Sequence, residues 1–464
     1  MRLQAAALRF QVQVVETPDA VTGHAGVALL IEAFRSLGLP RAVKRYVRLK
    51  RRERGYSEAT CIETLVALFA AGGDCLDDVR VLSADRGLTQ LWGRSAIPSA
   101  ETLRAFLNRF HNEESVAARV PHTAFVPAES LGLVGLGAIQ RELLAAVQKR
   151  SPVKRATLDV DATVIASEKR EALPVYDGGR GYQPLQVWWP EQGLWVRSEF
   201  RDGNVGAQTG VREIVRESIA TLRAMGVTEF AVRSDTAGYQ HTVLNDLRRE
   251  KIAFAISADM SPELRARALA VPEPAWKPLR QARNGGELVP STREWAEVEF
   301  IPDHGSYKKD EQPDRYLIER VRPVQLPLFA DGTPYHYYAI VTNRWDWDGE
   351  RLLRWAHERC GTVEPAHDVL KNELGGGVLP CKRFGANAAW WQIVILTANL
   401  IAALKLIALP LEWRPMRPKR LRFLLLHLAG RLVTHGRRIF LRLARDHPST
   451  TVFVEARRKL ALGT

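Results

Sequence analysis

The sequence predicts a mixed α/β fold in which an insertion interrupts the sheet, and two observations carry that prediction. From Thr157 the run T-L-D-V-D-A-T-V-I-A alternates polar and apolar residues with period two, as a β-strand does. Strand-like runs follow at 182–189 and 193–201, and the residues Pro190–Gly193 between them are typical of a hairpin connection. Helix-like and strand-like segments then alternate up to residue 258, as expected for an α/β sheet.

Residues 1–150 predict an all-helical domain. Apolar residues recur at helical spacing from Val27 to Val47, with a break at Gly38-Leu39-Pro40, and Ser57 can cap a helix that runs to Ala71. Such a block could contain a helix-turn-helix, but any small helical bundle gives the same pattern. A short strand is also expected at 8–15, and further helices are expected at 76–82, 100–110 and 133–148.

The predicted sheet occupies two stretches, 151–258 and 335–410. The order of elements in the first stretch, three antiparallel strands followed by alternating helix and strand, is that of an RNase H-like core. Residues 259–334 are rich in Pro, Gly and charge, and they contain strand-like pieces at 294–300 and 315–321. A structureless loop of that length is uncommon in a compact domain, so we interpret 259–334 as a β-rich insertion that forms a small domain.

A helix with Asp348 as its N-cap is expected after a strand at 337–342. Pro365 lacks an N–H, and its ring collides with the carbonyl four residues earlier, so the helix is expected to stop or bend at Cys360-Gly361. Thr362 would then cap the segment that follows. Further on, the uncharged run 388–404 predicts a buried core helix, since it is short for a membrane span and contains polar residues.

Positive charge is concentrated at the C-terminus. The chain has 464 residues and a net charge of +14, and residues 414–464 hold thirteen Lys and Arg against two acids. Residues 411–464 therefore predict a basic helical segment with a polyanionic partner, most commonly nucleic acid. A solvated tail or a face for anionic lipid is the alternative. The four cysteines lack CxxC spacing, so neither a disulfide framework nor a zinc site is expected.

Three acids are candidate ligands for metal ions: Asp161 in the first strand, Asp235 at the end of a later strand, and Glu364 on the helix. Asp159 lies on the same strand face as Asp161, so the choice between them stays open. The carboxyl ends of strands form the usual site crevice of an α/β sheet, and carboxylates without Cys or His suit Mg²⁺ or Mn²⁺. Two such ions can activate a water or a 3′-hydroxyl in phosphodiester displacement.

The motifs L-D-V-D-A-T, S-D-T-A-G-Y and R-C-G-T-V-E-P-A-H-D-V-L-K, with the β insertion, together resemble a DDE transposase of a bacterial insertion sequence. Asp235 follows Asp161 by 74 residues and Glu364 follows Asp235 by 129, which is similar to the insertion-sequence family numbered thirteen-eighty. The phrases F-R-D-G-N and R-F-G-A-N-A-A-W-W also resemble that family. The block around Glu364 is similar to a Tyr-Arg-Glu-Lys signature. It departs from that signature because Trp355 stands in place of the tyrosine and Arg359 is one residue further from Glu364.

The resemblance implies that Asp161, Asp235 and Glu364 hold two Mg²⁺ ions, which Mn²⁺ could replace, and that Arg359 and Lys371 contact phosphates at the transposon end. It implies nicking at the 3′ end and attack of that 3′-OH on target DNA. The partners would be terminal inverted repeats, target DNA and a second copy of the chain, because two ends must be brought together. Residues 1–150 would bind DNA or dimerise. The expected location is the bacterial cytoplasm, at the nucleoid when DNA is bound, with no membrane partner.

Other side chains and other functions fit less well. Lys308 and Lys309 of the insertion are expected to contact the DNA backbone or to be solvated. His357 and His367 flank Glu364 and could carry a proton, but a surface or structural role is favoured. The alternative functions are an RNase H-like nuclease that cuts without joining, and a DNA-binding protein whose catalytic site is idle.

Overall fold

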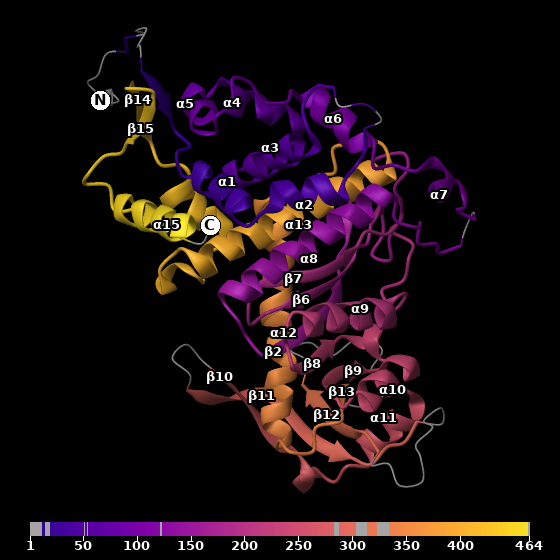
Figure 1. Ribbon diagram of the computed structural model, residues 1–464. Helices are drawn as coiled ribbons and strands as arrows, with labels where there is room; N and C mark the ends of the chain where they lie inside the picture. The colour runs from indigo at the N-terminus through magenta and orange to yellow at the C-terminus, as the bar shows by residue number, and fades with distance from the viewer. Residues whose placement is uncertain are drawn as a thin grey trace, which may run out of the picture.

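The computed structural model describes residues 12–13, 19–50, 52, 54–120, 123–282, 287–302, 313–322 and 334–462. Most of the strand expected at 8–15, and both Lys308 and Lys309, lie outside these residues. Figure 1 shows the N-terminal helices gathered at one end of the molecule and the strands of the insertion at the other, with the core strands between them.

The N-terminal block is helical, as predicted, and its helices begin where the sequence offers a cap. Ser57 Oγ accepts a hydrogen bond from the backbone N–H of Thr60 at 3.1 Å, and Ser99 and Ser130 cap later helices in the same way. Gly38, at φ +76°, separates the first two helices. The elements are α1 (Val27–Ser36), α2 (Leu39–Tyr46), α3 (Glu58–Ala71), η1 (Leu76–Asp78), α4 (Val79–Ala84), α5 (Arg86–Leu91), α6 (Ala100–Asn108), α7 (Glu113–Ala117) and α8 (Leu131–Arg150).

Helix α13 (Phe384–Ile407) is the predicted core helix, and it packs against α8, α3 and the edge strand β7 (Leu194–Glu199). Among the described helices it alone has, unbroken, the length and hydropathy of a membrane span, and 78 % of its apolar window is buried inside the protein. Its buried Asn399 accepts a hydrogen bond from the N–H of Trp195 at 2.8 Å and donates one to the carbonyl of Trp195 at 2.9 Å. The polar residue in this apolar helix therefore covers the free edge of β7.

Within the described residues, nine strands form one mixed sheet in the order β10-β11-β12-β13-β9-β8-β2-β6-β7. Strands β2, β8 and β9 are parallel neighbours, and the predicted hairpin β6–β7 pairs antiparallel with β2. The predicted strands of the core are confirmed to within a few residues. Their bounds are β2 (Arg155–Ala162), β6 (Leu185–Trp189), β8 (Glu229–Ser234), β9 (Ala253–Ala258) and β13 (His336–Thr342).

The insertion is β-rich, as predicted, but its strands extend the core sheet instead of forming a sheet of their own. Strand β12 (Arg315–Val321) pairs antiparallel with β13, and β11 (Leu288–Val298) and β10 (Lys277–Ala282) follow outward. Strand-like patterning indicates a strand but not the sheet edge that it joins, so the sequence could not distinguish these arrangements. The remaining elements of the core are β3 (Ile165–Ala166), β4 (Leu173–Pro174), β5 (Arg180–Tyr182), α9 (Val211–Ala224), η2 (Thr236–Gly238), α10 (His241–Arg249), α11 (Pro262–Leu269) and η3 (Glu273–Ala275).

The C-terminal segment is not wholly helical, which corrects the prediction for 411–464. Its middle is a hairpin, and β14 (Gly430–His435) also pairs with β1 (Ala20–Thr22). The runs R-L-V-T-H and R-I-F-L-R alternate with period two around a two-residue turn, a hairpin signal that a count of charges does not register. The segment comprises η5 (Leu411–Trp413), α14 (Pro418–Leu421), η6 (Arg422–Leu426), β14, β15 (Arg438–Arg442) and α15 (Thr450–Leu462).

Candidate active site

Asp161 and Asp235 lie side by side on neighbouring parallel strands. The register of β2 and β8 pairs Val160 with Ser234, and the two acids are the next residue of each strand. Parallel strands are about 4.8 Å apart, and paired residues point to the same face of the sheet. Asp235 Oδ1 accepts a hydrogen bond from the N–H of Ala237 at 3.0 Å, which begins the turn η2. The strand order alone therefore brings together two acids that are 74 residues apart in the sequence.

Helix α12 (Gly349–Asp368) crosses this face of the sheet, and Asp348 caps it as predicted. The predicted stop at Cys360-Gly361 is wrong, because the helix continues through Pro365 and ends in a π-helical turn, η4 (Val369–Glu373). A helix survives an internal proline when the carbonyl left without a partner finds another one. Gly361, whose carbonyl loses its partner, is exposed, so water can supply the missing hydrogen bond.

Thr362 does not cap a helix, since it lies within α12 and its hydroxyl donates to Asp159 Oδ2 at 2.5 Å. Asp159 is fully buried and accepts two more hydrogen bonds from Arg233, at 2.6 and 2.9 Å. Arg233 also donates to the backbone carbonyl of Trp355 at 2.6 Å, and its guanidinium lies 5.3 Å from the centre of the Trp355 ring. Asp159 is thus committed to joining β2, β8 and α12.

Asp161, two residues further along β2, is partly open and less completely paired. Its side chain is 15 % exposed and contacts Arg359 Nη1 at 3.3 Å and His367 Nδ1 at 3.5 Å. Burial raises the pKa of Asp161 to about 6: Arg359 opposes this shift, and the negative charge of Asp235 adds to it. Burial by itself would lower the pKa of Arg359, but the charges of Asp161 and Asp235 outweigh it and raise that pKa. The two acids are close enough for each to sense the charge of the other.

Glu364 and Lys371 lie on the same helical stretch. Glu364 is exposed, within α12 between the two residues that contact Asp161, and it accepts a hydrogen bond from the Cys360 thiol. Lys371 lies in η4, close enough to His367 for its charge to add to the effect of burial, which lowers the pKa of His367 to about 3.

The three acids do not form a closed cluster in this structure. In the described part of the chain, one group of three acid or thiol side chains has its ligand atoms all within 4.8 Å of one another, and it is Asp74, Cys75 and Asp78. The Asp78 carboxylate already accepts hydrogen bonds from the N–H groups of Asp74 and Cys75. At least one of the distances between the carboxylate oxygens of Asp161, Asp235 and Glu364 is therefore longer than 4.8 Å.

The model of a protein family described as "Transposase DDE domain group 1" matches residues 4–463. The chain belongs to this family. It is a DNA transposase, an enzyme that cleaves and transfers DNA strands. No curated protein matches the chain. A solved structure that matches is a piggyBac transposase synaptic complex with hairpin DNA, with a TM-score of 0.46 and 12 % identity over 89 % of this chain and 82 % of that one.

The two histidines of the transposase that flank Glu364 have structural contacts, as the sequence favoured. His367 is buried and its ring stacks on Trp195, with centroids 5.1 Å apart and planes 7° apart. With a pKa of about 3 it is neutral at physiological pH. His357 Nε2 lies 2.7 Å from Glu319 Oε1, on β12.

Sequence reasoning missed Arg233, which joins strands β2 and β8 to helix α12 beside the candidate acids. A signal was present, because residues 159 and 161 share one face of their strand and residues 233 and 235 share one face of theirs. Once β2 and β8 are paired in parallel, Arg233 lies beside Asp159 and Asp235 beside Asp161. The pairing itself required knowledge of the register, which no local pattern gives.

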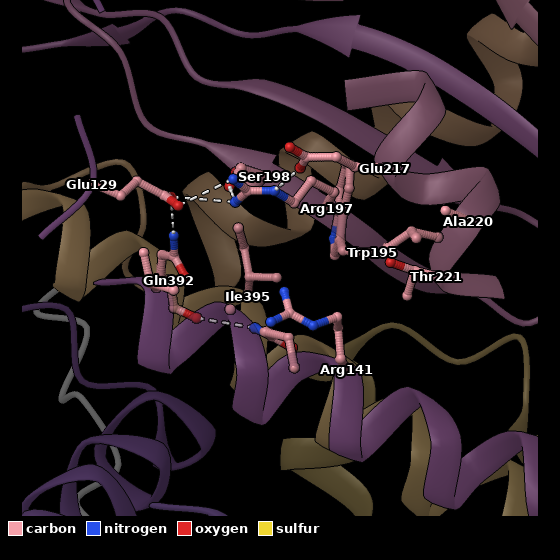
Figure 2. A pocket seen from close by; sticks show the side chains of 14 residues that line it. Glu129, Arg141, Trp195, Arg197, Ser198, Glu217, Ala220, Thr221, Gln392 and Ile395 are labelled. Carbon is pink, nitrogen blue, oxygen red and sulfur yellow. Dashed lines mark hydrogen bonds and ion pairs between the residues drawn. The ribbon is translucent and has the colours of Figure 1, made fainter. Parts of the chain in front are cut away.

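A pocket of about 460 Å³ lies elsewhere, beyond the β7 edge between α8, α9 and α13 (Figure 2). Arg197 projects into it and is held by Glu129 and Glu217, each at 3.1 Å (Figure 2). None of the three candidate acids lines this pocket. It is separate from the candidate active site.

Proposed function

We propose that Asp161, Asp235 and Glu364 are the catalytic carboxylates of this transposase, in an RNase H-like core. The observation that carries the proposal is that Asp161 and Asp235 directly follow the paired residues Val160 and Ser234, under a helix that contacts Asp161 from both sides of Glu364. The strand order β7-β6-β2-β8-β9, with an antiparallel hairpin followed by parallel strands, supports the core. Residues 1–150 would bind DNA or dimerise.

The same acids would hold two Mg²⁺ ions, or Mn²⁺ in their place. The donor set fits hard cations, because it consists of carboxylate oxygens without a thiolate. Burial, with a smaller contribution from the charge of Asp235, raises the pKa of Asp161 to about 6, and a bound cation would favour its ionised form. When bound, such ions supply an activated water or 3′-hydroxyl and stabilise the leaving oxygen.

Arg359 and Lys371 would contact DNA phosphates. Arg359 now contacts Asp161 at 3.3 Å, so a cation that takes its place on that carboxylate would free the guanidinium for a phosphate. Lys371 is partly exposed on the turn that follows α12. Lys308 and Lys309 lie outside the described residues, and their contact with the DNA backbone stays a prediction from the sequence.

The reaction would be nicking at the 3′ end of the transposon and transfer of that 3′-OH to target DNA. The motifs of the chain resemble those of the insertion-sequence family numbered thirteen-eighty, which supports terminal inverted repeats as its substrates. A homodimer would bring two ends together. The protein would act in the bacterial cytoplasm, on the nucleoid.

The test compares two glutamates of α12. Glu364→Gln should abolish Mg²⁺-dependent cleavage of a duplex taken from the ends of the element, while DNA binding is retained. Glu358→Gln is the matched control, since Glu358 is also exposed on α12 and its ion pair within the described residues is with Arg233, at 3.3 Å. Equal activity of both variants would overturn the assignment. Wild-type cleavage without joined products would instead favour a nuclease that does not transfer strands.

A further inference from the structure

The hairpin β14–β15 is a ribbon with two unlike faces. Its register pairs Arg431 with Arg442, Val433 with Phe440, and His435 with Arg438. Since directly opposed residues of an antiparallel pair share a face, these six side chains lie on one face. That face carries three arginines, a histidine, a phenylalanine and a valine.

The opposite face of the ribbon is attached to the protein. Leu432 is 2 % exposed, and Leu441 packs against the hydrophobic core. Leu441 and Ile439 also line a groove against α1 and α15. Figure 1 shows the ribbon at the end of the molecule that is remote from the strands of the insertion. Because the apolar face of the ribbon packs against the protein, its basic face is turned outward.

The outward face carries more positive charge than the protein neutralises. Opposed like charges destabilise a strand pair, and here Arg431 is opposite Arg442. Arg431 binds Asp19, beside β1, at 2.6 Å. In the part of the chain that the structure describes, Arg438 and Arg442 are exposed and have no acid within ion-pair distance. Such an arrangement suits an external anion.

The turn at the tip adds one more arginine at a conformational cost. Gly436 and Arg437 form a two-residue loop, with φ of +55° and +63°. Both values are those of a type I′ turn, where Asn and Gly are preferred because other side chains are strained at positive φ. An arginine at this position, exposed at the tip, does not serve the stability of the hairpin.

We propose that the outward face and tip of the β14–β15 ribbon bind duplex DNA through its phosphates. Charge complementarity supports this occupant, and a two-stranded ribbon has the dimensions of a major groove. The contact would lie on a stretch of DNA other than the one at the carboxylates, so its loss would weaken binding without affecting bond cleavage. The proposal rests on the transposase family of the chain, and it does not depend on which acids are catalytic.

The experiment measures binding of a fluorescent duplex of random sequence, without metal, as a function of salt. The double variant Arg438→Gln/Arg442→Gln should lower the slope of log K against log salt by about 2, since each phosphate contact contributes about 0.9. Arg437→Gly should also weaken binding while it keeps or raises the melting temperature, because glycine accepts the positive φ. This second variant separates loss of contact from loss of fold.

The matched control is Arg457→Gln/Arg458→Gln on α15. It removes the same charge from the same segment, but these arginines are paired with Glu32 and Glu455. Its slope should equal that of the wild type. If the slope fell equally in both double variants, net charge alone would explain the effect, and the proposal would be overturned. A ribbon variant that binds DNA normally would also overturn the proposal. This holds even if that variant no longer binds phosphatidylserine vesicles or has a different oligomeric state. Loss of cleavage in Glu364→Gln has no bearing on these outcomes.

Discussion

Two aspartates on one face of strand β2 have opposite surroundings. Asp159 is fully buried, takes two hydrogen bonds from Arg233 and one from Thr362, and has no exposed surface. Asp161 is 15 % exposed and has one arginine contact, at 3.3 Å. Both acids face α12, but only Asp161 lies beside a second acid, Asp235. The same side chain therefore joins structural elements at position 159, and at position 161 it is partly open and, in the proposed site, a catalytic ligand.

The comparison shows how the protein prepares a charged site. Each acid has an arginine, but only the Asp159 pair has the bidentate geometry and full burial of a permanent contact. The Arg359 contact with Asp161 is longer and made by a single nitrogen. The buried pair of Asp159 and Arg233 joins the helix to the sheet, and in the proposed site the weaker contact of Asp161 with Arg359 would give way to a cation and a phosphate.

The largest expected effect is that of Asp161→Asn on activity. Cleavage should fall by at least about 10²–10³-fold, the loss typical of a group that stabilises charge in the transition state. Metal-free stability should rise by up to about 3 kcal/mol at neutral pH, because about two pKa units separate the folded state from the ordinary value.

The sign of that stability change can be checked against pH. The folded protein binds a proton at Asp161 more tightly than the unfolded chain does, so ionisation destabilises the fold. The advantage of the Asn variant should be absent below about pH 4, grow between about pH 4 and 6, and stay constant above that. Urea unfolding across this range measures it. A variant less stable than the wild type at pH 7 would contradict the account.

Asp159→Asn should act on stability instead. Removing one partner of a buried pair leaves Arg233 uncompensated and costs about 3–5 kcal/mol. The double variant Asp159→Leu/Arg233→Met should recover much of that loss, since apolar residues of similar size replace buried pairs well. Denaturant midpoints of the three proteins provide the measurement. If the double variant were no more stable than Asp159→Asn, the pair would not be the cause.

Arg359→Gln should have a smaller effect, with opposite signs for metal binding and for strand cleavage. Removing a positive charge beside Asp161 should strengthen Mg²⁺ binding by about 1 kcal/mol, the interaction of two unit charges near 4 Å in water. Strand cleavage at saturating metal should nevertheless fall, because a phosphate contact is lost. Titration of metal by calorimetry, beside a cleavage assay, separates the two. Weaker metal binding would show that Arg359 supports the site instead of competing for it.

Local patterns were sufficient for much of this fold. Period-two alternation located β2, strand-like runs located β6, β7 and β8, and a cap residue located the start of α3 and α12. Asp235 was recognised because it directly follows a strand. These signals are contained in a few consecutive residues, and the folded protein preserves them.

What local patterns could not give was the outcome of contacts between distant segments. Pro365 predicted a break in the helix, but the exposed position of Gly361 and the packing of α12 on the sheet allow it to continue. Thr362 has the chemistry of a cap, yet its partner is 203 residues away. The choice between Asp159 and Asp161 likewise depended on Arg233, which approaches only when β2 and β8 are in register.

Thr362 offers the smallest test of the same comparison. Thr362→Val keeps the shape of the side chain and removes its hydrogen bond to Asp159, which Arg233 still satisfies, so the loss should be about 1–2 kcal/mol. Thr362→Asn distinguishes the two roles of this residue. A cap accepts Asn as well as Thr, whereas the buried contact with a carboxylate in mid-helix does not tolerate the larger amide. Unfolding midpoints should therefore fall further for Asn than for Val, and the reverse order would restore the interpretation of Thr362 as a cap.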